Sequence, residues 1–180
     1  EADRLATEEG LAYIHGFDAP DIIAGQGTIG LEILEQVKNA DAIVCPVGGG
    51  GLLAGLCLAV KSLRKKIRII GVESTATGNL TAALKARRPV LRPRRPTLAD
   101  GLATLTVGPN AFSLIRGRVD RVVQVGEDWI ALAILRFVER DKIVIEGAAA
   151  GPAQLLVEAR QGPATLASFT LRPEFVAGRA

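Results

Sequence analysis

The sequence predicts an α/β fold with a mostly parallel, twisted sheet and helices on both faces. Buried-strand patterns at 41–47, 68–72 and 119–125 alternate with helix patterns along the chain. Strands separated by helices form βαβ units with right-handed crossovers, which place parallel strands in one sheet. The length of 180 residues and the 48% share of apolar residues suit one domain with a packed core.

Each element follows from a local pattern. A polar-faced helix at 1–9 is expected to end at Gly10, because glycine is a common C-terminal stop. The first half continues with a strand-type run at 11–15, a turn at 25–28 (GQGT), a helix with Ile29, Ile33 and Val37 on one face, the strand 41–47 and a helix at 52–63. It is followed by the strand 68–72 ending at Glu73, a helix at 77–86 and a basic loop with several prolines at 87–97. The last predicted elements are the strand 119–125, a helix at 127–140 and a small-residue helix from Ala148.

The composition bears on where the domain begins and ends. The chain contains no methionine, although a chain of this length usually carries several, so we expect it to begin inside a longer protein. We therefore expect a large domain at 1–160 that is incomplete on its N-terminal side. The stretch 161–180 has weak patterning and two prolines, and its structure is left unassigned.

Composition also limits the setting and the partners. Cys45 and Cys57 have neither disulfide-framework nor zinc-site spacing, which favours a reducing, cytoplasmic location. The uncharged run 42–60 is interrupted by Pro46 and four glycines, so no membrane span is expected. The net charge is only +3, and no aromatic residue interleaves the basic loop, so we expect a solvated or subunit-facing loop rather than a nucleic-acid site.

Four consecutive glycines, Gly48, Gly49, Gly50 and Gly51, join a predicted strand to a predicted helix. Without Cβ atoms such a loop can direct several N–H groups at one anion, and the helix N-terminus adds positive charge. A phosphate is the expected ligand. A nucleotide P-loop is excluded because no Gly-Lys-Ser/Thr follows. A dinucleotide loop stays open, since Gly49 begins a G-x-G-x-x-A pattern and Glu73 ends the next strand.

Three further motifs accompany this loop. In chain order the four are Gly25–Glu32 (GQGTIGLE), Cys45–Gly55 (CPVGGGGLLAG), Gly71–Ser74 (GVES) and Ala99–Ala103 (ADGLA). Together they resemble the pyridoxal-phosphate-dependent threonine and serine dehydratases, a fold-type II group that includes serine racemase. The resemblance covers the chain from its first residue to about Val157. It implies that Gly48–Gly51 hold the phosphate of pyridoxal 5'-phosphate and that Gly101 and Glu146 lie beside its ring.

The resemblance also implies a cation site. Glu73, Thr77 and Asn79 stand where the family places its metal ligands, and the carbonyls of Leu102 and Thr104 are further candidates. Oxygen ligands alone suit potassium, magnesium or calcium better than zinc, and of these we expect potassium or magnesium. The residues by themselves leave alternatives open: a solvated carboxylate for Glu73, and a capping or surface role for Glu146.

The implied activity is that of an ammonia-lyase, which converts L-threonine or L-serine into a 2-oxo acid and ammonia. The alternatives are a serine racemase-type enzyme and a Rossmann-type dinucleotide-binding domain. The family's Schiff-base lysine and its Ser-Gly-Asn-His loop would precede Glu1, and its Ser/Cys-Gly-Gly-Asn segment has no counterpart after Gly162. We therefore expect a parent enzyme that is a dimer or tetramer and acts on a small amino acid, and no catalytic residue or activity in this chain alone.

Overall fold

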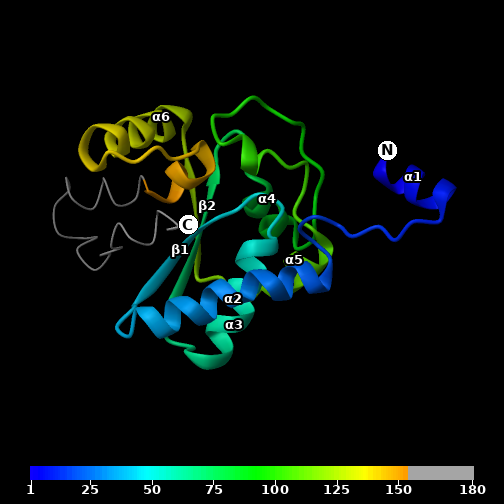
Figure 1. The fold of residues 1–180 in the computed structure, drawn as a ribbon, viewed down its shortest axis with the longest axis horizontal. Coiled ribbons are helices and arrows are strands. Elements are labelled where there is room, and N and C mark those ends of the chain that lie inside the picture. Colours follow the sequence, from blue (N-terminus) through cyan, green and yellow to red (C-terminus); the bar gives the residue numbers. More distant parts are fainter. Residues whose placement is uncertain (154–180) are drawn as a thin grey trace.

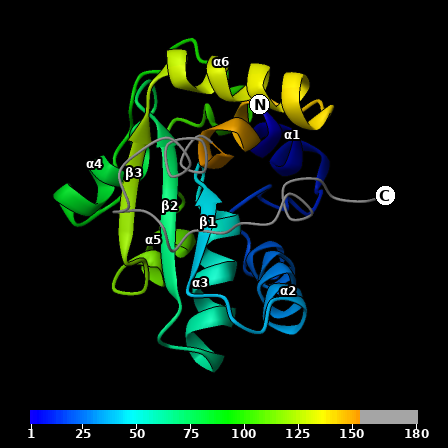
Figure 2. The same cartoon turned by 90° about the vertical axis from the view of Figure 1, so that its left-hand side faces the viewer.

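A three-stranded parallel sheet forms the centre of the molecule. The structure is a computed structural model that describes residues 1–153, so the segment 161–180 lies outside the described residues. The sheet order is β1 (Ala42–Pro46), β2 (Arg68–Ser74) and β3 (Arg121–Val125), and all neighbours are parallel. Figure 2 shows the three strands side by side, pointing the same way. The predicted parallel sheet is confirmed.

Helices cover both faces of this sheet (Figure 1). One face shares a core with α3 (Gly51–Leu63), α4 (Asn79–Ala86) and α5 (Pro109–Ile115), and α2 (Pro20–Gln36) packs on α3. The other face is covered by α6 (Glu127–Arg136), the π-helical turn η2 (Phe137–Asp141) and helical residues 147–153. Because helices cover both faces, the central strand β2 is buried from Ile69 to Ser74.

Two expectations for the first forty residues are wrong. The run 11–15 forms no strand: no described strand lies beside it, and Tyr13 and Ile14 are exposed. The GQGT motif lies inside α2, which begins earlier, with Pro20 at its first position. Gly27 of this motif serves helix packing, because a Cβ added at Gly55 of α3 would lie 2.5 Å from the carbonyl oxygen of Ile23 and 2.6 Å from the amide nitrogen of Gly27.

The later elements agree with the sequence apart from their ends. The strands at 41–47, 68–72 and 119–125, the helix at 52–63 and the irregular basic loop are confirmed. The helix expected at 77–86 begins at Asn79, and the one expected at 127–140 changes to the π-helical turn after Arg136. No helix within residues 1–153 has both the length and the apolar composition needed to cross a membrane.

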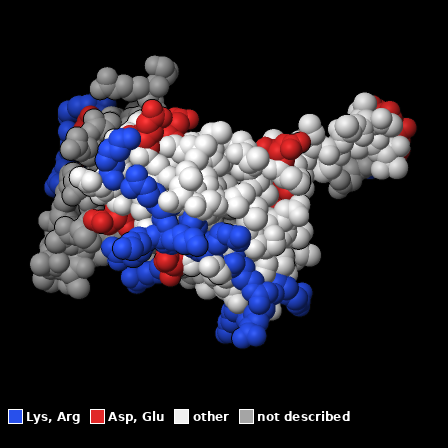
Figure 3. Space-filling view, turned by 90° about the horizontal axis from the view of Figure 1, so that it is seen from below, with Lys and Arg blue, Asp and Glu red and all other residues white. Residues whose placement is uncertain are grey.

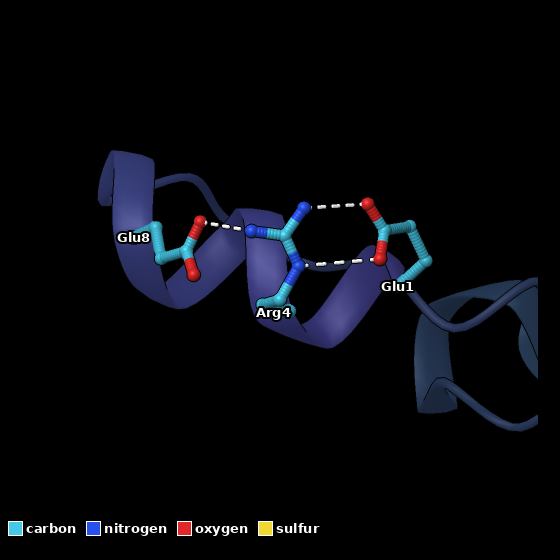
Figure 4. Close-up of polar contacts among 3 residues, drawn as sticks. All are labelled: Glu1, Arg4 and Glu8. Atoms are coloured by element: carbon cyan, nitrogen blue, oxygen red, sulfur yellow. Dashed lines mark hydrogen bonds and ion pairs between the residues drawn. The ribbon is translucent and has the colours of Figure 1, made fainter.

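The first helix, α1 (Ala2–Glu9), stands apart from the rest of the molecule (Figure 1). It ends at Gly10 in the left-handed conformation, as predicted. Arg4 bridges the carboxylates of Glu1 and Glu8 (Figure 4), with 2.6 Å between its Nη2 and Glu1 Oε1. These exposed ion pairs join residues one helical turn apart, so they act within α1 and do not attach it to the domain.

Candidate functional site

The glycine loop lies where β1 ends and α3 begins. Gly50 has φ +94°, a left-handed conformation that side chains rarely adopt, and its amide group precedes the first residue of α3. A Cβ added at Gly51 would lie 2.3 Å from the carbonyl oxygen of Phe17, and one at Gly50 would lie 2.9 Å from Val107. Only glycine therefore fits at Gly50 and Gly51 without a shift of the surrounding chain.

The N–H groups of this loop have no partners in the described part of the chain. Gly48, Gly49, Gly50 and Gly51 donate no hydrogen bond to another described residue, and the first helical bond of α3 runs from Ala54 N–H to Gly50 O at 2.8 Å. No side chain caps α3 either. Unpaired N–H groups at a helix N-terminus bind anions, so the loop has the geometry and the polarity of a phosphate cradle.

Two other predicted residues lie beside the loop. A Cβ added at Gly48 would lie 3.0 Å from the Cα of Leu102 and 3.4 Å from the carbonyl oxygen of Gly101. A Cβ added at Gly101 would in turn lie 3.9 Å from Oε2 of Glu146. The carboxylate of Glu146 is exposed and accepts no hydrogen bond from described residues. The fold therefore brings together Gly48, Gly101 and Glu146, from three segments far apart in sequence.

Hydrogen bonds of Asp18 that support the glycine loop were not predicted from the sequence. The carboxylate of Asp18 is buried and accepts hydrogen bonds from the N–H groups of Ala111 at 2.8 Å and Asn110 at 3.2 Å, at the start of α5. The preceding Gly108 donates its N–H to Gly49 O at 3.0 Å. Asp18 thus fixes the neighbouring Phe17 against the glycine loop, yet it lies more than ninety residues from its partners, so no local pattern reveals it.

The predicted cation ligands lie at the end of β2. The carboxylate of Glu73 is only 1% exposed and accepts hydrogen bonds from Leu80 N–H at 2.8 Å, Thr81 N–H at 3.0 Å and Gln124 Nε2 at 3.1 Å. The solvated alternative for Glu73 is therefore wrong: its carboxylate is buried and caps the N-terminus of α4. Thr77 is also buried, and its hydroxyl donates to Ser74 O at 3.2 Å.

Asn79 differs from Glu73 in keeping one atom without a partner. Its Nδ2 donates to Thr104 O at 2.7 Å and to Thr104 Oγ1 at 3.1 Å, which fixes the orientation of the amide. Its Oδ1 is buried and makes no hydrogen bond with the described residues. A buried oxygen without a donor suits a cation or a water as its partner.

A second carboxylate at this edge of the sheet was also missed. Glu127, at the start of α6, accepts hydrogen bonds from the hydroxyls of Ser74 and Thr97, both at 2.7 Å, and from Leu98 N–H at 2.6 Å. Burial raises the pKa of this carboxyl, but these hydrogen bonds outweigh it, so the pKa of Glu127 lies below its ordinary value. Glu127 thereby holds the segment that leads to Gly101.

The basic loop ends at these contacts, because its last residue, Thr97, donates a hydrogen bond to Glu127. Residues 87–97 are irregular, and the side chains of Arg94 and Arg95 are exposed. Lys and Arg gather in a broad area on one face of the molecule, with few acidic side chains among them (Figure 3). The expectation of a solvated or subunit-facing loop, with no nucleic-acid partner, stays a prediction.

Comparison with known proteins settles the family. The family model described as "Pyridoxal-phosphate dependent enzyme" matches residues 1–165. The chain belongs to this family. This family implies pyridoxal phosphate as the cofactor, so the dinucleotide alternative is set aside. Glu73 agrees with this, because its carboxylate is bound to α4 rather than free to reach a ribose.

The relatives of this chain include threonine ammonia-lyases. It is 44% identical over 153 residues to an L-threonine ammonia-lyase of Geobacter sulfurreducens, covering 85% of this chain and 38% of the relative. It is 42% identical over 147 residues to one of Thermotoga maritima, covering 82% and 37%. The chain thus spans less than half the length of these relatives.

Solved structures give the same relationships. The threonine deaminase of T.th. superposes with a TM-score of 0.82 at 40% identity, and the match covers 89% of this chain and 59% of that one. A serine racemase from Dictyostelium discoideum superposes with a TM-score of 0.76, also at 40% identity, covering 84% and 48%. These similarities confirm the α/β fold of the family.

Proposed function

We propose that this chain is the cofactor-phosphate-binding part of an ammonia-lyase that converts L-threonine or L-serine into a 2-oxo acid and ammonia. The observation that carries the proposal is the set of N–H groups at Gly48–Gly51, which have no partner within residues 1–153 and lie at the N-terminus of a helix without a side-chain cap there. The threonine ammonia-lyases similar to the chain at 42–44% identity support the substrate class.

The residues present fit pyridoxal 5'-phosphate. The N–H groups of Gly48–Gly51 would bind the phosphate oxygens, and Phe17, packed on Gly49, would keep water from one side of the loop. The carboxylate of Glu146 lies beside Gly101 without a partner among the described residues, so it can hold or accept a proton near the ring. When bound, the cofactor supplies an electron sink for bond cleavage at the substrate Cα.

We also propose a potassium or magnesium ion at the end of β2. The buried Oδ1 of Asn79, which has no partner among the described residues, and the buried carboxylate of Glu73 support it, with Thr77 and main-chain carbonyls as further oxygen ligands. Three of the roughly four lone pairs of Glu73 already accept hydrogen bonds, which leaves it one to share with a cation. Potassium and magnesium are each expected to raise the melting temperature of the wild-type chain more than that of an Asn79→Ala variant.

The phosphate cradle is tested by comparing pyridoxal 5'-phosphate with pyridoxal, which lacks the phosphate, in equilibrium dialysis against the chain. We expect binding that requires the phosphate and that inorganic phosphate inhibits. Gly50→Ala, which places a side chain at φ +94°, is expected to weaken binding about tenfold, whereas Gly25→Ala, with open space around its Cβ, is not. Equal binding of pyridoxal would contradict the proposal.

The reaction is tested on the full-length protein. We expect it to release a 2-oxo acid from L-threonine or L-serine, and the chain alone to release none. The serine racemase alternative, supported by a solved structure at 40% identity, predicts D-serine instead. Chiral chromatography of the product separates the two activities.

We further propose that the protein is cytoplasmic, which the two free, buried thiols support. We propose that it is a dimer or tetramer, and light scattering measures its mass.

A further inference from the structure

Asp18 and the N-terminus of α5 hold each other in place beside the glycine loop. Asp18 is only 6% exposed, and its two carboxylate oxygens accept the N–H groups of Ala111 at 2.8 Å and Asn110 at 3.2 Å. In return, Asn110 Nδ2 donates to the main-chain oxygen of Asp18 at 2.9 Å. A helix of seven residues is too short to be stable by itself, so these bonds determine where α5 begins.

Gly108, directly before α5, connects this pair to the glycine loop. A Cβ added at Gly108 would overlap with Oδ1 of Asp18, so only glycine fits beside the carboxylate. The N–H of Gly108 donates to Gly49 O at 3.0 Å. The carboxylate of Asp18 therefore acts on the loop through one intermediate residue.

The bond to Gly49 O determines the direction of the next N–H group in the loop. The peptide between Gly49 and Gly50 is trans, so its C=O and its N–H point in opposite directions. Because Gly49 O points to Gly108, the N–H of Gly50 points away from it, and this N–H has no partner within residues 1–153. Glycine allows many backbone conformations, so without the bond to Gly108 this peptide would populate several orientations. Asp18 and α5 thus hold one donor of the cradle in a single orientation.

We propose that Asp18 is a positioning residue for the cofactor phosphate. Its carboxylate fixes Gly108, Gly108 fixes the peptide between Gly49 and Gly50, and the Gly50 N–H is directed at the phosphate before the cofactor binds. A donor that is already oriented loses less conformational entropy on binding, which increases the affinity. This role rests on the proposed phosphate cradle, but the link between Asp18 and the loop can be measured in the chain without cofactor.

The first test is amide hydrogen exchange of the 180-residue chain without cofactor, followed by NMR with isotope-labelled glycine. We expect the N–H of Gly108 to exchange at least about tenfold faster in Asp18→Ala than in wild type, and about threefold faster in Asp18→Asn, which keeps one acceptor oxygen. Gly71, inside β2, reports opening of the whole domain and is expected to change less. Equal changes at Gly108 and Gly71, or none at Gly108, would overturn the link between Asp18 and the loop.

The second test measures cofactor affinity, which a purely structural role would leave unchanged in a folded variant. In equilibrium dialysis, Asp18→Ala and Asp18→Asn are expected to bind pyridoxal 5'-phosphate about tenfold and about threefold more weakly than wild type. Asp120→Asn is the matched control, because it also alters a carboxylate that accepts a main-chain N–H, that of Ile69, and we expect less than a twofold change. Urea denaturation verifies that each variant is folded at the temperature used.

The outcomes separate this role from the cradle on which it rests. Wild-type affinity in the folded Asp18 variants would show that Asp18 only stabilises α5 and would overturn the proposal. An equal loss of affinity in Asp120→Asn would show general destabilisation and would also overturn it. No phosphate-dependent binding by the wild-type chain would instead contradict the cradle itself, and with it the positioning role.

Discussion

The N-termini of α3 and α4 lie at the same edge of the sheet, but only that of α4 receives a side-chain carboxylate among the described residues. The N–H groups of α4 receive the buried carboxylate of Glu73, an anion that the chain itself supplies. The N-terminus of α3 follows four glycines, has no side-chain cap, and keeps its N–H groups unpaired within residues 1–153. The difference shows that the N-terminus of α4 has a structural role, because the chain supplies its anion. The N-terminus of α3 has no such anion, so it is the candidate for binding an anionic ligand.

Removing the internal anion from α4 is expected to have the largest effect. Glu73→Ala leaves Leu80 N–H, Thr81 N–H and Gln124 without their buried acceptor, and we expect unfolding free energy to fall by about 3 kcal/mol. Glu73→Gln keeps one acceptor oxygen and is expected to lose about half as much. Urea denaturation measures both. A loss below about 0.5 kcal/mol for Glu73→Ala would mean that α4 does not depend on this carboxylate.

A side chain at the open end of α3 tests the other half of the comparison. Gly51→Ala places a Cβ 2.3 Å from the carbonyl oxygen of Phe17, so we expect a loss of about 1–3 kcal/mol and weaker binding of pyridoxal 5'-phosphate. Gly25→Ala, inside α2 with open space around it, is expected to stabilise the chain by about 0.4–1 kcal/mol. Urea denaturation of the pair decides: two changes of the same sign would contradict the packing argument.

The sequence revealed the open helix end but not the carboxylates of Asp18 and Glu127 near it, and the reason is the range of their contacts. A buried strand, four glycines and an apolar helix are adjacent in sequence, so the loop between β1 and α3 could be predicted from local pattern alone. The hydrogen bonds of Asp18 to α5 and of Glu127 to Ser74 join residues 53 to 93 positions apart. No local periodicity encodes such pairs.

Glycine itself shows the same limit. At Gly50 it allows a left-handed conformation, inside the loop that the sequence pattern predicted between a strand and a helix. At Gly27 and Gly55 it allows two helices to approach closely, and Gly27 was predicted to lie in a turn. The two uses differ only in tertiary contacts, since α2 needs α3 beside it before the absence of a side chain has any effect. This explains why the GQGT segment was assigned wrongly.

The pH dependence of stability tests the hydrogen bonds that Glu127 accepts at this edge of the sheet. The pKa of this carboxyl is below its ordinary value of 4.5 in the folded chain, so its hydrogen bonds stabilise the fold above that pH. This stability is lost as pH falls through the folded pKa. We expect Glu127→Gln to lower the unfolding free energy by about 1–2 kcal/mol at neutral pH and to flatten its decline below about pH 4.5. Urea denaturation across pH measures it, and parallel pH curves for the two proteins would contradict the assignment.

The C-terminal end of α3 provides the smallest effect and a control for the open end. Lys61, in the last turn of α3, donates to Asp120 Oδ2 at 2.7 Å, and Ile69 N–H donates to the same oxygen at 2.7 Å. Burial raises the pKa of Asp120, but these two donors outweigh it and lower that pKa. Because the Asp120 side chain is 38% exposed, solvent screens the pair, and we expect Asp120→Asn to cost less than about 1 kcal/mol.

Affinity for pyridoxal 5'-phosphate should not change, since Asp120 lies at the opposite end of α3 from the glycine loop. A loss of affinity comparable to that of Gly51→Ala would mean that the two ends of the helix are coupled, and the open N-terminus would then not act alone.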